Sequence, residues 1–169
     1  GIPVISYDRP IPDTPADYYV SFDNEAIGAA IAQSLIDHLA EEGADGGILQ
    51  VNGSPTDAAA GLIKDGVSGV VDTSDYEVLA EFDTPGWQPP DAQEWVGSQI
   101  NLYRDDIVGV VAANDGTGGA SIAALRSAGI DPVPPVTGND AELAAIQRIV
   151  GGDQFNTISK PIEIVAGAA

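Results

Sequence analysis

Residues 107–115, IVGVVAAND, decide the fold class of this chain. From Ile107 to Ala113 the stretch contains only apolar side chains and one glycine, which is typical of a strand buried on both faces of a parallel sheet. Polar Asn114 and Asp115 end the strand, and residues 116–129 continue with apolar side chains at helical spacing. The stretch therefore predicts a strand followed directly by a helix.

The same alternation continues on both sides of this stretch. Further strands are expected within residues 2–7, 46–53, 76–82, 134–140 and 154–160, and further helices within 21–43, 56–72, 92–104, 141–152 and 161–169. Strands and helices that alternate about every 25 to 30 residues form βαβ units with right-handed crossovers. The predicted fold class is therefore α/β, with a doubly wound parallel sheet.

The composition disfavours several classes of function. The 169 residues include 26 acidic and 6 basic side chains, and the net charge of −20 argues against nucleic acid and anionic membranes as partners. We interpret this acidity as a solubility or salt adaptation, with attraction of a cationic ligand as the alternative. The chain has no cysteine, and its one histidine, His38, is expected to be structural. No cofactor, no metal site and no membrane insertion are expected.

Polar or aromatic side chains follow nearly every predicted strand. In open parallel sheets ligands bind beyond the carboxyl ends of the strands, so these side chains form the candidate site. The strand ends carry neither a nucleophile–base pair nor a phosphate-binding glycine motif. Their carboxylates, amides, cations and indole suit the hydroxyls and the apolar face of a sugar. The candidate ligand-binding residues are Asp8, Arg9, Trp87, Asn114, Asp140 and Lys160.

Several of these residues have a structural alternative that the sequence leaves open. Trp87 lies in a proline-flanked loop and either offers a flat face to a sugar or folds onto the core. The alternative for Asn114 and Asp115 is a helix N-cap, with Asp115 expected to be that cap, and Asp140 has the same alternative for the following helix. Lys160 has the alternative of a solvated turn residue.

A set of longer motifs follows one order along nearly the whole chain: GIPVISYDRPIP (1–12), DYYVSFDNEAIG (17–28), GSPTDAAA (53–60), GWQP (86–89), VVAANDGTGGASIAAL (110–125), VTGNDAELAAIQRIVGG (136–152) and TISKPI (157–162). In kind and order they resemble the type I periplasmic binding proteins of ABC importers, most nearly the xylose-binding ones. The resemblance implies two α/β lobes that close on a monosaccharide and a receptor that delivers it to a membrane permease. It also implies a monomer in the periplasm or outside the cell, either free or attached by a lipid.

Carried over position by position, the resemblance implies a role for each candidate residue. The pair Asp8–Arg9 matches a sugar-gripping pair in the first lobe, and Trp87 matches an aromatic wall. Asn114 and Asp140 match hydroxyl partners in the second lobe, and Lys160 matches a polar contact at the hinge.

One departure from the family concerns ligand specificity. The resemblance implies two Asn residues directly after the motif GSPTD, one of which reaches the sugar in the xylose-binding proteins. In this chain Ala58 and Ala59 occupy these two positions. The change removes a hydrogen bond worth about 0.5–1.5 kcal/mol. Either a bulkier hexose or a bridging water is expected in the space.

The resemblance also implies a division of the chain. Residues 1–21 are expected to be a strand and hinge entry of an incomplete first lobe, 22–158 a complete second lobe, and 159–169 the hinge return with the start of a first-lobe helix. The chain is accordingly expected to be a fragment that lacks most of the first lobe.

Two functions of other classes remain as alternatives. The effector-binding core of a lac-repressor-like transcription regulator has the same fold and is the main alternative. A sugar-processing enzyme would use Asp8 and Asp140 as paired carboxylates. No enzymatic activity is expected, because the resemblance implies acids that grip sugar hydroxyls in their ionised form.

Overall fold

A parallel sheet of three strands forms the core of the structure, a computed structural model that describes residues 1–11 and 15–169. Strand β3 (Gly47–Asn52) lies between β4 (Val78–Asp83) and β5 (Ile107–Ala112). All six residues of β3 are buried, because the strand has a neighbour on each side and helices on both faces.

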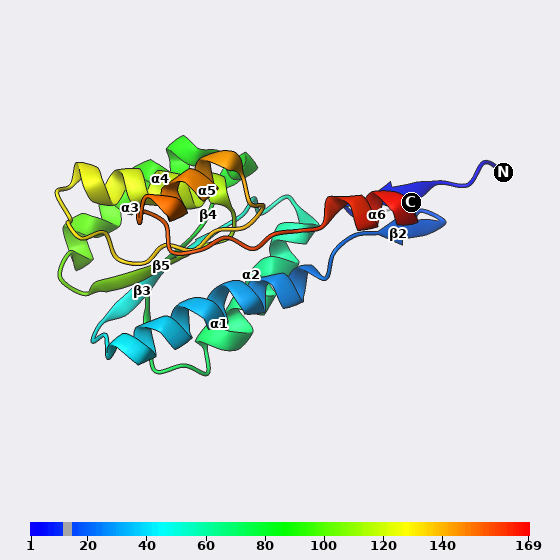
Figure 1. The fold of residues 1–169 in the computed structure, drawn as a ribbon. Coiled ribbons are helices and arrows are strands. Elements are labelled where there is room, and N and C mark those ends of the chain that lie inside the picture. The colour runs from blue at the N-terminus through cyan, green and yellow to red at the C-terminus, as the bar shows by residue number, and fades with distance from the viewer. Residues whose placement is uncertain (12–14) are drawn as a thin grey trace.

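Helices cover both faces of this sheet, as Figure 1 shows. Residues of β5 alternate between two apolar clusters: Val110 packs with α3 and α4, whereas Val111 packs with α1 and α2. The predicted α/β class with a parallel sheet is therefore confirmed. In the ranges that the structure describes, none of the helices combines the length and apolar character needed to cross a membrane. The helices are α1 (Asn24–Glu42), α2 (Ala58–Val71), the short 3-10 turn η1 (Pro85–Trp87), α3 (Pro89–Tyr103), α4 (Asp115–Ser127), α5 (Leu143–Val150) and α6 (Ile162–Ala168).

The strands predicted within 134–140 and 154–160 are wrong as full strands and form only single bridges. Val136 bridges Val110 of β5, and Asn139 bridges Ile158, both in parallel. Prolines at positions 134 and 135 have no N–H to donate, which interrupts the ladder beside β5. The two segments nevertheless continue the sheet beyond β5, so their polar ends reach the same edge as those of the regular strands.

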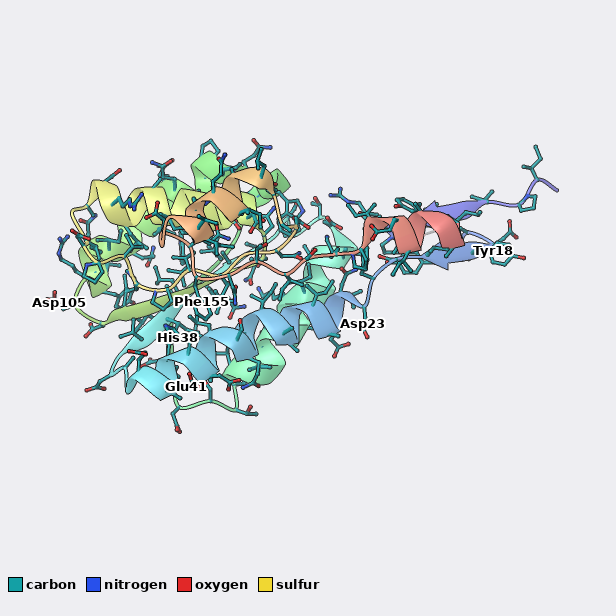
Figure 2. The ribbon with its side chains drawn as sticks, viewed as in Figure 1. Tyr18, Asp23, His38, Glu41, Asp105 and Phe155 are labelled. Carbon is teal, nitrogen blue, oxygen red and sulfur yellow. The ribbon has the colours of Figure 1, made fainter. Side chains whose placement is uncertain are left out.

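A second, two-stranded parallel sheet lies at the other end of the molecule (Figure 1). It pairs β1 (Ile5–Tyr7) with β2 (Tyr18–Val20), and α6 lies at this end as well. The strand expected within residues 2–7 forms over Ile5–Tyr7, with an exposed residue at each end. Ile5 is 43% exposed and Tyr7 is 44% exposed, since β1 pairs with β2 alone within the described part of the chain. Tyr18, labelled in Figure 2, is also exposed.

His38 has a packing role, in line with its expected structural nature. Its ring stacks on Phe155 with 4.5 Å between the ring centroids, so that α1 is joined to the segment after α5 (Figure 2). Local contacts set both ends of α1. Asp23 accepts a hydrogen bond from the N–H of Ala26, and Gly43 ends the helix with a φ of 65°.

A network of polar groups connects α2 to the sheet. Lys64 of α2 donates from Nζ to Asp83 (2.9 Å) and Glu81 (3.4 Å) on β4. Asn52 of β3 donates to the same Asp83 carboxylate (3.0 Å) and accepts from the buried Gln50 (2.9 Å). Burial opposes the charge of Lys64, but the Asp83 hydrogen bond and the two negative charges outweigh it and raise the pKa of Lys64 above 10.5.

This ion pair predicts an alkaline dependence of stability. Because the folded pKa lies above the unfolded one, the pair stabilises the fold below about pH 10.5, and this contribution disappears as the pH rises through the folded pKa. Lys64→Met is expected to lower the free energy of unfolding by at most about 1 kcal/mol near neutral pH, since the pair is partly exposed. In urea unfolding the difference from the parent should shrink toward zero as the pH rises through the folded pKa of Lys64. A difference that does not diminish in alkaline solution would show that the effect is not electrostatic.

Candidate functional site

A cavity of about 800 Å³ opens at the carboxyl ends of the parallel strands. The residues that follow β3, β4 and β5 line it because the ends of parallel strands meet at one edge of a sheet, and the residues that follow β1 of the small sheet line it as well. The geometric expectation that the candidate residues lie together is confirmed. Their role in ligand binding stays a prediction. The candidate residues that line the cavity are Asp8, Arg9, Trp87, Asn114, Asp140 and Lys160.

Asp8 and Arg9 are held by the small sheet. Asp8 has a φ of 65°, and its N–H donates to the carbonyl of Val20 (2.9 Å). Its own carbonyl accepts from the hydroxyl of Ser21 (2.8 Å). The turn thus directs both side chains toward the cavity, where Arg9 pairs with the carboxylate of Asp57 at 3.3 Å.

Trp87 packs on the core and also lines the cavity, so the expected core packing is present and its role as a sugar wall stays a prediction. Its indole lies directly against Gly53, where a Cβ would come within 2.1 Å of the ring. Only glycine leaves room for the ring in this position. Trp87 has a φ of 58°, a strained value for tryptophan. Its indole Nε1 donates to Asp57 (3.0 Å).

Asn114, and not Asp115, is the N-cap of α4, which corrects the sequence prediction. Asn114 has extended backbone angles, and its Oδ1 accepts from the N–H (2.8 Å) and the hydroxyl (2.9 Å) of Thr117. The Oδ1 of Asn114 is thus occupied by the cap, while Nδ2 is the group that remains for a ligand. Asp115 is the first helical residue and is fully buried.

Asp140 and Lys160 form an ion pair on the rim of the cavity. The distance from Lys160 Nζ to Asp140 Oδ1 is 2.6 Å, and the ammonium also lies 5.6 Å from the ring centre of Phe22. The two alternatives for these residues are therefore wrong. Asp140 does not cap α5, whose N-cap is Glu142, and Lys160 is not a solvated turn residue, because its side chain is only 20% exposed.

Sequence reasoning missed five polar residues that line the cavity: Asn24, Ser54, Thr56, Asp57 and Asn139. Asp57 stands in the motif GSPTDAAA after β3, so the strand-end rule could have found it. Asn139 is 2% exposed, and its Oδ1 has no hydrogen-bond partner within residues 1–11 and 15–169. Asn24 is the first residue of α1 and is buried.

Ala58 and Ala59 line the cavity as well. They open α2, next to its N-cap Asp57, and the N–H of Ala59 donates to Asp57 Oδ1 (3.0 Å). Their methyl groups offer no hydrogen bond, so this part of the wall is apolar. The cavity as a whole combines carboxylates, amides, two cations and an indole, which can together bind a ligand that both donates and accepts hydrogen bonds.

Two relatives are similar to this chain over 95% or more of its length. It is 36% identical to the D-xylose-binding periplasmic protein of Escherichia coli (strain K12), an alignment that covers 100% of this chain and 51% of that protein. It is 31% identical to a multiple sugar-binding periplasmic receptor of Rhizobium radiobacter, over 95% of this chain and 51% of that protein. The chain thus spans about half the length of these curated relatives.

Solved structures agree with the sequence relatives. An ABC transporter solute-binding protein from Clostridium phytofermentans, solved with bound β-D-glucose, superimposes with a TM-score of 0.83 at 29% identity, covering 99% of this chain and 56% of that one. The family described as periplasmic binding protein domain matches residues 1–169. The chain therefore belongs to the periplasmic binding protein domain family.

Proposed function

We propose that this chain contributes the ligand cleft of an extracytoplasmic receptor that captures a monosaccharide between two lobes. The observation that carries the proposal is the convergence of the predicted polar and aromatic side chains on one cavity. In this proposal residues 22–158 form one lobe, and residues 1–21 and 159–169 belong to the other. The segments around 21–23 and 159–161 then act as the hinge between them.

The chemistry of the cavity favours a sugar over other small molecules. Sugar hydroxyls each donate and accept, so they can pair with the carboxylates, with the amide of Asn114 and with the cation of Arg9. The indole of Trp87 offers an apolar face that suits the C–H side of a pyranose ring. The similarity to xylose-binding and multiple sugar-binding proteins supports the same ligand class.

The same observations favour a receptor over the two alternatives. Asp140 is paired with Lys160 at 2.6 Å. This arrangement suits a carboxylate that accepts a hydrogen bond from a sugar hydroxyl, and it does not suit an acid that donates a proton for glycosidic cleavage. The relatives named above are periplasmic binding proteins, which favours the receptor over a transcription regulator. We further propose that the receptor acts as a monomer in the periplasm or outside the cell and delivers its sugar to the permease of an ABC importer.

A thermal-shift screen of the whole protein against monosaccharides tests the proposal. Ligands that bind only the folded state raise the melting temperature in proportion to RT ln(1 + [L]/Kd). We expect at least one pentose or hexose to raise it in a concentration-dependent way, while amino acids of similar size do not. A flat response to all monosaccharides, or turnover of one of them to a new product, would reject the receptor function.

The alanines at the start of α2 predict which sugar binds. Because Ala58 and Ala59 leave space and offer no amide, we expect D-glucose to bind at least as tightly as D-xylose. The variant Ala59→Asn restores one hydrogen-bonding side chain and should improve xylose binding by about 2- to 12-fold relative to glucose. Calorimetry with both sugars measures the ratio, and Ala30→Asn, on the exposed face of α1, is the matched control. A parent protein that clearly prefers xylose would show that the two alanines do not set specificity.

A further inference from the structure

Asp57 makes more contacts than its place as a helix cap requires. It lies between β3 and α2, and its side chain is 8% exposed. Oδ1 accepts the capping bond from the N–H of Ala59 (3.0 Å). Oδ2 accepts from the indole Nε1 of Trp87 (3.0 Å) and pairs with the guanidinium of Arg9 (3.3 Å). The two oxygens thus serve different purposes, because only Oδ2 reaches the other walls of the cavity.

The contact with Trp87 completes the placement of the indole. The residue follows Gly86, and both have positive φ values (58° and 57°), so the turn presents the side chain from a strained backbone. Gly53 supports the ring on one side, where a Cβ would collide with it. A ring held only by apolar contact can still rotate about its two side-chain torsions, whereas a hydrogen bond at Nε1 selects one orientation.

We propose that Asp57 is a positioning residue, which through Oδ2 sets the orientation of the Trp87 indole in the cavity before a ligand arrives. Arg9 forms an ion pair with the same oxygen, so a rotation of the carboxylate would break both the ion pair and the hydrogen bond from Trp87. The effect on ligand affinity rests on the proposed function. The orientation of the indole does not depend on it and can be measured without any ligand.

Two substitutions separate this role from that of a simple helix cap. Asn at position 57 can still accept the capping bond, but its second group is an NH₂ that meets the indole N–H donor to donor. Ser at position 57 also caps and has no second oxygen at all. Both Asp57→Asn and Asp57→Ser therefore keep α2 capped and remove the two contacts at Oδ2, with Trp87 and with Arg9. Asp65→Asn removes the same charge from an exposed position on the same helix and is the matched control.

The first test is the NMR signal of the indole N–H in this chain, which contains two tryptophans. Trp95→Phe assigns the signal of Trp87. We expect hydrogen exchange of the Trp87 indole N–H to be at least about tenfold faster in Asp57→Asn and Asp57→Ser than in the parent, with a changed chemical shift. The Asp65→Asn signal should match that of the parent. Unchanged exchange and shift in both Asp57 variants would overturn the proposal.

The second test is a double-mutant cycle with Trp87→Phe, which keeps an aromatic face but has no N–H. In calorimetry with D-glucose and D-xylose on the whole protein, Asp57→Asn should weaken binding about tenfold in the parent and less than about twofold in the Trp87→Phe background. A loss of the same size in both backgrounds would show that Asp57 contacts the sugar directly and would overturn the positioning role. If neither sugar binds the parent, the proposed function fails for these sugars, while the exchange measurement still decides the role of Asp57.

Discussion

Replacing Asp115 by Ala is expected to lower the free energy of unfolding by about 3–5 kcal/mol, because it leaves several buried donors without an acceptor. The carboxylate is fully buried. Oδ1 accepts from the side-chain amide of Gln154 (2.9 Å), and Oδ2 accepts from the N–H of Glu142 (2.9 Å) and the hydroxyl of Thr157 (2.9 Å). One side chain therefore holds together α4, the start of α5 and the segment that leads back to the small sheet.

Urea unfolding of the parent and of Asp115→Ala measures this loss, with Asp105→Ala as the control. Asp105 is an exposed acidic residue before β5 (Figure 2), and its removal should change stability by less than about 0.5 kcal/mol. If Asp115→Ala costs no more than the control, the buried network does not hold α5 in place.

The second large effect is expected from Trp87→Ala, which should weaken monosaccharide binding by about 1–3 kcal/mol, or roughly 5- to 150-fold. The substitution removes a packed aromatic face from the cavity and leaves the ring's place beside Gly53 open to water. Most of the loss should appear as faster release, because association depends on diffusion and lobe orientation more than on one side chain.

Calorimetry and stopped-flow fluorescence of the whole protein test this effect with the sugar that gives the largest thermal shift. Trp95→Phe is the control, because Trp95 stacks on Phe82 with 5.3 Å between ring centroids and does not line the cavity. Equal dissociation constants for the parent and Trp87→Ala would reject Trp87 as a wall of the ligand site.

The sequence alone determined the α/β alternation through β3, β4 and β5 and the edge of the sheet where the candidate residues gather, but it did not predict β2 or reduce the segments within 134–140 and 154–160 to single bridges. The apolar run of β5 predicts a strand buried on both faces, because each of its residues must pack against a helix layer. Once the strands are parallel, their polar ends must meet at one edge, so Trp87, Asn114 and Asp140 are predicted to be neighbours without any tertiary information.

The sequence could not predict which of two adjacent residues caps a helix, or whether a strand is covered by neighbouring elements. Whether Asn114 or Asp115 caps α4 depends on where the first helical turn begins, and both side chains are good caps. The exposure of Ile5 depends on what packs over β1, and an apolar strand has the same sequence pattern with or without that cover.

Only the tertiary structure decided which polar groups pair across the cavity. Asp57 is next to α2 in the sequence and has the pattern of an ordinary N-cap, yet its second oxygen meets Trp87, which lies 30 residues further along the chain, and Arg9 from the small sheet. A local pattern reports the contacts that a residue makes within its own turn of helix or strand. Partners that are distant in the sequence come into contact only when the sheet is assembled, so the sequence determined which chemistry stands at the strand ends, and packing determined which of those groups bind one another.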